Sequence, residues 1–185
     1  MIMDVPKLHR DEAIRQIDER KIDIVFALIT VSTSRYTSRL SGAEIEDKSG
    51  DIAMDIIEGH GYKIGMRRLI PDDRDEIIKC LQSALESKCN VVIFIGGTGI
   101  SSDDVTTDVL EDILEKRLYG FGELFRYLSY QSIGPSAMLS RAIAGTYKNA
   151  AIFALPGSPD AVRLALNKLI IPEIKHIVYL LEREN

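Results

Sequence analysis

The sequence predicts an α/β fold of three layers, in which helices cover both faces of a mostly parallel sheet. Two apolar runs, Val91–Ile95 (VVIFI) and Ala151–Leu155 (AIFAL), have no polar face, which is typical of parallel strands buried between helices. Strand and helix patterns also alternate from Asp23 onward, which favours right-handed crossovers. The 185 residues fit one domain, which we expect over residues 22–185 after an extension over residues 1–21.

The extension and the first strand differ in composition. Residues 1–21 are polar and charged, and they predict a loose tail and a short helix over Arg10–Glu19, both outside the core. Asp23–Val31 (DIVFALITV) is apolar and β-branched, and predicts the first strand. The segment Tyr36–Glu46 has no clear periodicity and therefore predicts a loop.

The next elements lead to the centre of the sheet. Asp47–Gly50 predicts the start of a helix, and the loose alternation of Tyr62–Ile70 predicts a strand. Pro71 ends that strand, and Asp72 can cap a helix that runs to about Ser87. After Val91–Ile95, a glycine turn precedes a helix that begins at Asp104.

The last third of the chain predicts three more helices and the end of the sheet. Tyr119–Ile133 predicts a glycine-broken turn followed by an amphipathic helix, whose aromatic residues favour core or interface packing. A short helix from Gly134 to about Arg141 and a strand or hairpin over Ala142–Lys148 follow. Beyond the strand Ala151–Leu155, Ser158 and Pro159 start a helix to Leu169, and Pro172 separates it from a final helix.

Composition excludes several classes of protein. The chain is 45% hydrophobic and 28% charged, with no apolar run that approaches a membrane span, and its start lacks the pattern of a secretory signal. We therefore expect a cytoplasmic protein without a membrane partner. A net charge of −5 without a Lys/Arg cluster argues against nucleic-acid binding. Cys80 and Cys89 form no CxxC motif and predict buried thiols.

Polar and glycine residues follow several of the predicted strands. Ser32–Arg35, Gly96–Asp104 and Leu155–Pro159 each leave a strand, and Asp72 stands at a fourth exit. The ends of parallel strands meet at one edge of the sheet, so these segments predict one pocket, with the Ser32 hydroxyl among its polar groups. Two carboxylates beside glycine-turn amides suit a Mg²⁺-nucleotide.

Simpler interpretations exist for the same residues. Asp72 and Asp104, each taken alone, are more simply helix N-caps, and Gly97 and Gly99 can be ordinary turn glycines. The segment GGTGISSDD matches neither GxxxxGK[ST] nor GxGxxG. The three histidines, His9, His60 and His176, predict surface residues, so no catalytic triad is supported.

The order and spacing of several short motifs resemble one known family. They run from TVS at Thr30–Ser32 through the D-x-S-G of Asp47–Gly50, Pro71-Asp72, GGTG at Gly96–Gly99, Asp104-Val105-Thr106, GFGELFR at Gly120–Arg126 and PSAMLSRAIAG at Pro135–Gly145 to LPGSP at Leu155–Pro159. Together they resemble molybdenum cofactor biosynthesis proteins of the MoaB and MogA type, which are related to the G domain of gephyrin. GFGELFR, SRAIAG and LPGSP favour MoaB.

The resemblance implies an α/β/α fold, homotrimers or hexamers, and a reaction. Adenylyltransferase members bind molybdopterin and use MgATP to make adenylyl-molybdopterin and pyrophosphate. By position, Asp72 and Asp104 match the two functional aspartates, which would also hold Mg²⁺, and Glu123 matches an acidic residue of the site. The phosphate-binding loop corresponds to Gly97, Thr98 and Gly99, and the opposite wall of the pocket to Pro156, Gly157 and Ser158.

The sequence differs from the family pattern next to Asp104. MogA-like members have arginine immediately before this aspartate, and here the residue is Asp103. Arg35, Arg39, Lys48, Arg126 and Arg141 are candidates to supply the missing charge. A second hypothesis is therefore a molybdopterin-binding or scaffold protein without catalysis, and a third is a nucleotide-binding domain that needs no pterin.

Overall fold

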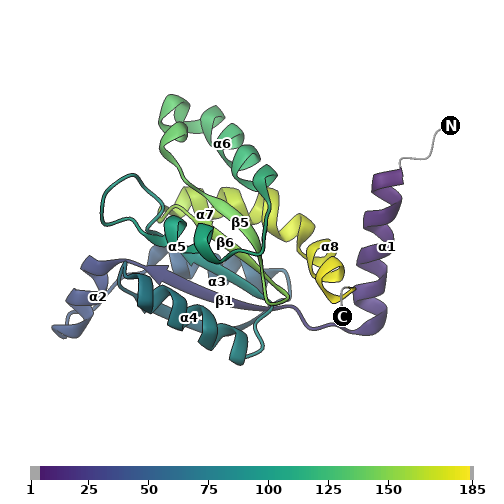
Figure 1. Ribbon diagram of the computed structural model, residues 1–185, viewed down its shortest axis with the longest axis horizontal. Helices are drawn as coiled ribbons and strands as arrows, with labels where there is room; N and C mark the ends of the chain where they lie inside the picture. Colours follow the sequence, from purple (N-terminus) through teal and green to yellow (C-terminus); the bar gives the residue numbers. More distant parts are fainter. Residues whose placement is uncertain (1–4, 184–185) are drawn as a thin grey trace.

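The computed structural model describes residues 5–183, which form a six-stranded sheet in the order β2-β1-β3-β6-β5-β4 (Figure 1). The strands β1 (Val25–Val31), β2 (Lys63–Ile70), β3 (Val91–Ile95) and β6 (Ala150–Leu155) are parallel. The strand β5 (Ile143–Tyr147) is antiparallel to β6, and the short β4 (Lys116–Arg117) completes that edge. The predicted, mostly parallel sheet is confirmed.

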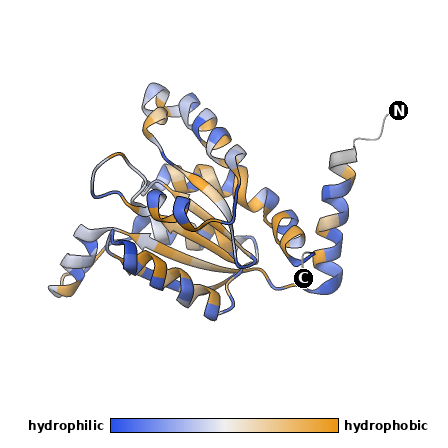
Figure 2. Ribbon diagram, in the orientation of Figure 1, coloured by the Kyte–Doolittle hydropathy of each residue, from blue (hydrophilic) through white to orange (hydrophobic). Residues whose placement is uncertain are grey.

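Helices bury both faces of this sheet, so the predicted three layers are also confirmed. On one face lie α3 (Lys48–Gly59), α6 (Tyr119–Ile133), α7 (Pro159–Ala165) and α8 (Ile171–Glu182), and on the other α4 (Arg74–Glu86) and α5 (Thr106–Ile113). Successive residues of β1 alternate between the two cores, with Phe26 and Leu28 in the first and Ala27 and Ile29 in the second. The central strands β1, β3 and β6 are accordingly almost entirely apolar and buried, and Figure 2 shows strand ribbons that are largely orange.

The strand β2 is one edge of the sheet, and its pairing with β1 is irregular. The register shifts between Phe26 and Ala27, which places Gly65 outside the regular pairing. A side chain at Gly65 would meet the Val25 side chain at 2.8 Å. The glycine therefore allows β2 to lie close to β1 at this shift.

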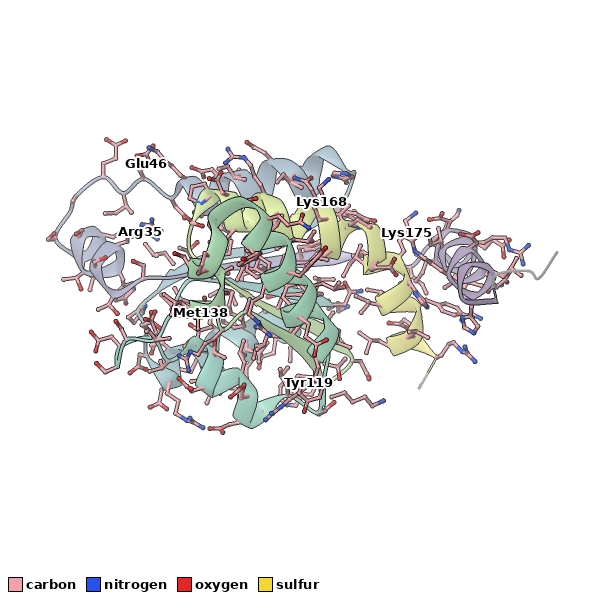
Figure 3. All side chains as sticks on the ribbon, turned by 90° about the horizontal axis from the view of Figure 1, so that it is seen from above. Arg35, Glu46, Tyr119, Met138, Lys168 and Lys175 are labelled. Atoms are coloured by element: carbon pink, nitrogen blue, oxygen red, sulfur yellow. The ribbon has the colours of Figure 1, made fainter. Side chains whose placement is uncertain are left out.

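The N-terminal segment differs from its prediction. Helix α1 covers Val5–Arg20, longer than Arg10–Glu19, and packs against α8. Ala13 is fully buried and Ile17 belongs to the core, so the expectation that this segment lies outside the core is wrong for both residues. Ion pairs Arg10–Glu173 at 2.7 Å and Lys175–Asp18 at 2.6 Å also join the two helices (Figure 3). The first four residues of the predicted tail lie outside the described residues, and the domain boundary at residue 21 stays a prediction.

The predicted loop over Tyr36–Glu46 is also partly wrong, because α2 (Thr33–Leu40) occupies its first half. No residue of α2 is buried, so it has no apolar stripe by which periodicity could reveal it. Its signal is the N-cap, since the Ser32 hydroxyl accepts a hydrogen bond from the Arg35 amide at 3.4 Å.

Asp47 joins three elements near the start of α3. Its carboxylate accepts hydrogen bonds from the Thr30 hydroxyl at 2.7 Å, the Gly50 amide at 3.1 Å and the Arg67 guanidinium at 3.1 Å. Burial alone would raise the pKa of Asp47, but these hydrogen bonds and the Arg67 charge outweigh it and lower the pKa. Asp47 therefore holds β1, α3 and β2 together, which gives the D-x-S-G motif a structural role.

Two helices of the C-terminal half differ from their prediction. Helix α6 runs unbroken through Gly120 and Gly122 instead of following a turn; a side chain at Gly122 would meet the Ala142 carbonyl oxygen at 2.6 Å. The helix from Pro159 does not stop before Pro172, because a π-helical turn over Leu166–Ile170 leads directly into α8. Pro172 lies in the first turn of α8, where a missing amide is tolerated.

The remaining predictions for this half hold. A 3-10 helix, η1, covers Gly134–Leu139. Lys148 and Asn149, both with positive φ, turn β5 into β6 as a hairpin. Strand β4 was not predicted, because two residues carry no periodicity. Within the described residues, no helix has both the length and the apolar character needed to cross a membrane.

Candidate phosphate and pterin site

The four parallel strands end side by side, so their exit segments meet at one edge of the sheet. The Ser32 amide donates to the Ile70 carbonyl at 2.9 Å, and the Gly96 amide donates to the Leu155 carbonyl at 2.9 Å. The Asp72 amide donates to the Thr33 hydroxyl at 3.0 Å. The predicted convergence of the strand exits is therefore observed.

The turn after β3 requires glycine at its first two positions. Gly96 and Gly97 have φ of +113° and +63°, which side chains disfavour. A Cβ atom at Gly96 would collide with the Val31 carbonyl oxygen, and one at Gly97 with the side chains of Asp72 and Thr106. Gly97 is therefore in contact with Asp72 on one side of the turn.

The turn presents backbone amides that the protein does not use. Carbonyl groups of the turn are bound: Gly97 O accepts from the Thr106 amide at 3.0 Å and Thr98 O from the Arg141 amide at 3.2 Å. The N–H groups of Gly97, Thr98 and Gly99 find no acceptor within residues 5–183. Successive unpaired amides of this kind form an anion-binding concavity.

These amides open into a cavity of about 550 Å³. Gly97, Thr98 and Gly99 line it together with Asp104 and with Pro156–Ser158, of which Gly157 lies next to Gly96. Its remaining wall is mostly apolar and comes from α6, η1 and α7: Phe125, Ile133, Ala137, Leu139, Ala161 and Leu164. A ligand whose phosphate group binds at the turn could thus place a flat ring against the apolar wall of the cavity.

Neither aspartate is the helix cap that its position alone suggests. The N-cap of α4 is Asp73, which accepts from the Glu76 amide at 3.0 Å, and not Asp72. The N-cap of α5 is Val105, and the Asp104 carboxylate instead accepts from the Ser101 amide at 3.1 Å. The simpler interpretation is therefore wrong for both residues.

Asp72 contacts the turn at Gly97 but does not line the cavity. Its Oδ1 accepts from the Val105 amide at 3.3 Å and the Thr106 hydroxyl at 3.4 Å. Burial, followed by the charges of Asp104 and Asp103, raises the pKa of Asp72 and outweighs these two hydrogen bonds. Burial and the neighbouring acids thus make the negative charge on Asp72 less favourable than it is in water.

This raised pKa leads to a prediction about stability. A carboxyl group whose pKa is raised in the folded state stabilises the fold while it is protonated. Its contribution is complete below the unfolded pKa of about 3.9 and is lost as pH rises through the folded-state pKa. Asp72→Asn, neutral at every pH, should therefore increase the free energy of unfolding at pH 7, by no more than about 1 kcal/mol because solvent screens a partly exposed charge. Urea unfolding at pH 7 and in acid measures the gain, which should shrink in acid.

The neighbouring residue provides the control. Asp73→Ala removes the true N-cap of α4 and should lower the free energy of unfolding by about 1 kcal/mol. A loss of stability in Asp72→Asn at pH 7 would contradict the role assigned to burial and repulsion.

Two other predicted site residues lie elsewhere. Ser32 caps α2 and does not line the cavity, although it is next to Thr33 at the same edge. Glu123 is exposed on α6 and does not line the cavity either. Their roles in binding stay predictions.

The structure adds residues that were not singled out from the sequence. Ser129, Ser132 and Ser136 line the cavity with Ser140. Ser129 and Ser132 are three residues apart on α6, so their spacing was a signal that could have revealed them, whereas Ser136 and Ser140 follow the end of this helix and gave no such signal.

No lysine or arginine lines this cavity in the described part of the chain. Of the candidate cations, Arg35 lies 3.8 Å from Asp47, and Lys48 lies 3.3 Å from Glu46. Arg39 lines a separate groove. Arg126 donates to carbonyl groups of Ser140 and Ala142, both at 3.4 Å. Arg141 contacts the loop that carries Asp104.

The other reactive side chains have structural positions. Cys80 and Cys89 are buried free thiols, as predicted, and burial raises the pKa of Cys80 to about 11. His9 and His60 are exposed, while His176 is partly buried and lies 3.3 Å from Glu173. None of these residues lines the cavity.

The fold and the site together define a class: an α/β protein with an anion-binding turn and an apolar cavity at the carboxyl edge of its sheet. Comparison of residues 27–176 with known families gives a match to one described as "Probable molybdopterin binding domain". The chain belongs to this molybdopterin-binding family, as the sequence motifs predicted.

Individual relatives agree with this assignment. "Molybdenum cofactor biosynthesis protein B" of Bacillus cereus is 41% identical over 159 residues, which cover 85% of this chain and 90% of the relative. "Probable molybdopterin adenylyltransferase" of Methanocaldococcus jannaschii is 43% identical over 157 residues, covering 84% and 93%. A crystal structure of a molybdenum cofactor biosynthesis protein B superimposes with a TM-score of 0.78 at 39% identity, covering 87% and 97%.

Proposed function

We propose that this protein transfers AMP from MgATP to the terminal phosphate of molybdopterin, which gives adenylyl-molybdopterin and pyrophosphate. The observation that carries the proposal is the row of unpaired amides at Gly97–Gly99 beside Asp104, which opens into a cavity with an apolar wall. The Methanocaldococcus relative, named as a probable molybdopterin adenylyltransferase, supports the same reaction. A cytoplasmic location is part of this proposal.

The site offers contacts for both parts of molybdopterin. The amides of Gly97–Gly99 and the Thr98 hydroxyl hold the phosphate of molybdopterin, while the apolar wall of the cavity contacts the pterin. A phosphate oxygen attacks the α-phosphorus of ATP, the new P–O bond forms, and the bond to the bridging oxygen breaks. Pyrophosphate leaves with the electron pair of that bond.

The two aspartates suit Mg²⁺ as a partner of the nucleotide. Asp104 Oδ1 and Asp72 Oδ2 have no hydrogen bond to any other described residue, so each carboxylate keeps one oxygen available. The described residues hold no cluster of three or more His, Cys, Asp or Glu side chains suited to a metal. This donor set fits an ion that takes its other ligands from phosphates and water. When bound, Mg²⁺ offsets negative charge on the leaving pyrophosphate.

A pyrophosphate-release assay tests the proposal. Purified protein with molybdopterin and MgATP should release one pyrophosphate per adenylyl-molybdopterin formed, and omission of either the pterin or Mg²⁺ should abolish release. Tight nucleotide binding without any pterin would instead favour a general nucleotide-binding domain.

One observation favours a second candidate, a molybdopterin-binding or scaffold protein without catalysis. Asp103 replaces the expected arginine, and no cationic side chain lines the cavity in the described chain. ATP would then have little to attract its triphosphate. Molybdopterin binding without pyrophosphate release, at saturating MgATP, would support this candidate against the enzyme.

We further propose that the protein forms a homotrimer or hexamer through α6 and η1. Leu124, Tyr127 and Tyr130 on α6 are 53–62% exposed, and Met138 on η1 is 77% exposed. Figure 3 shows Met138 and Tyr119 at the two ends of this segment. Exposed aromatic and apolar side chains concentrated on one segment are typical of an interface.

Sedimentation measures this assembly. Tyr127→Asp should convert the oligomer to monomers, because a charge would be buried in the interface. Leu40→Asp, at a residue of α2 that is 72% exposed, is the matched control and should leave the assembly unchanged. A monomeric wild-type protein at working concentration would contradict the proposal.

A further inference from the structure

The loop over Gly99–Asp104, here called the site loop, has little packing to hold it in place. Ile100 is 71% exposed, and Ser101, Ser102 and Asp103 are exposed too. Within the loop, the Asp104 amide donates to Ser101 O at 3.1 Å, and the Ser101 amide donates to the Asp104 carboxylate at 3.1 Å. The position of the Asp104 carboxylate therefore depends on what anchors the two ends of the loop.

A single guanidinium group binds both ends. Arg141 Nε donates to Gly99 O at 2.7 Å, and its Nη2 donates to Asp104 O at 2.7 Å. The remaining nitrogen, Nη1, donates to the Asp108 carboxylate at 2.7 Å. Charge-assisted hydrogen bonds from a planar fork are both stronger and more directional than neutral ones. The Arg141 side chain thus fixes the distance between Gly99 and Asp104, the two ends of the loop.

The backbone of Arg141 is itself held against the same region. Its amide donates to Thr98 O at 3.2 Å, and its carbonyl accepts from the Thr107 hydroxyl at 3.1 Å. In a planar trans peptide the carbonyl and the following N–H point in opposite directions. With the carbonyls of Thr98 and Gly99 bound to Arg141, the amides of Gly99 and Ile100 must face away from it.

We infer that Arg141 is the positioning residue of the site, which sets the direction of the Gly99 amide, one of the three phosphate-binding amides, and the place of the Asp104 carboxylate. Arg141 does not line the cavity, so it acts through the loop and not by touching the ligand. Its effect on adenylyl transfer rests on the proposed function, whereas its effect on the loop does not.

The first test uses ligand-free protein. Arg141→Lys keeps the charge and the backbone hydrogen bonds but loses the fork, so the Ser101 and Asp104 amides should exchange hydrogen about ten- to a hundredfold faster. Arg126→Lys is the matched control: its guanidinium donates at 3.4 Å to Ser140 and Ala142 and does not touch the loop, so loop exchange should not change. Unchanged exchange in Arg141→Lys would overturn the inference.

A second variant covers the case in which Arg141→Lys folds poorly. Asp108→Asn removes the negative charge of the exposed carboxylate that binds Nη1 of Arg141, and leaves the two hydrogen bonds to the loop. It should accelerate loop exchange by a smaller factor, severalfold. Exchange identical to wild type in both folded variants would contradict a positioning role.

Kinetics then separate positioning from a merely structural role. Arg141→Ala should lower kcat for pyrophosphate release about ten- to a hundredfold, with a smaller change in the KM for molybdopterin, and added guanidinium ion should restore part of the rate. Equal concentrations of sodium chloride should not restore the rate. Failure of guanidinium to restore any rate would count against the inference. If wild-type protein releases no pyrophosphate, the proposed function fails, and the exchange results alone decide the role of Arg141.

Discussion

Asp104→Asn is expected to reduce kcat for pyrophosphate release at least about a hundredfold while molybdopterin still binds. Asparagine has the same shape, and its carbonyl oxygen can still accept from the Ser101 amide, so the site loop should keep its conformation. It lacks the negative charge that would hold Mg²⁺ next to the phosphates. Pyrophosphate release and molybdopterin titration, measured on the same protein, test both expectations.

Asp103→Asn is the matched control for this prediction. It removes the same charge from the adjacent residue, which is exposed and does not line the cavity. Its kcat should remain within a few fold of wild type, because an exposed charge at this distance is screened. Turnover in Asp104→Asn equal to that of Asp103→Asn would refute the assignment of Asp104.

Gly96→Ala is expected to lower the free energy of unfolding by about 2–5 kcal/mol. The φ of +113° is unfavourable for alanine, and the added Cβ would collide with the Val31 carbonyl oxygen, a backbone atom of β1 that cannot turn aside. For a protein of this size the melting temperature should fall by roughly 5–15 °C. Urea and thermal unfolding measure the loss.

Gly61→Ala separates the two causes of this loss. Gly61 also has a positive φ, +80°, but no atom lies within 4 Å of the place that a Cβ atom would take there. It should therefore show only the backbone cost of about 1–2 kcal/mol. Equal losses in the two variants would mean that the close approach to β1 contributes nothing.

Local patterns were enough to predict the sheet and the position of the site. The central strands β1, β3 and β6 are almost entirely apolar, and the residues after them include glycines, hydroxyls and acids, so both signals lie within a few residues of each other. Parallel pairing then brought Gly97, Asp104 and Gly157 to one cavity without any further information.

Other features depend on contacts that a single segment does not reveal. Asp72 and Asp73 are adjacent, and either can cap a helix by sequence. The choice depends on the Val105 amide and the Thr106 hydroxyl, which lie more than thirty residues away and donate hydrogen bonds to Asp72. Gly122 similarly suggests a turn in the sequence. In the structure it lies within a helix, where the Ala142 carbonyl oxygen leaves no room for a side chain. Arg141 gave no signal of its role, because its partners are mostly backbone carbonyls.

The irregular pairing of β2 with β1 has a consequence for how copies of the protein associate. A strand at the border of a sheet can recruit a strand from another molecule, which leads to fibrous aggregates. Here the shift at Phe26 and Ala27 interrupts the regular spacing, and Lys63 and Arg68 are charged and exposed along the same strand. Both features discourage stacking through this border, so we expect copies of the protein not to join into fibres through β2.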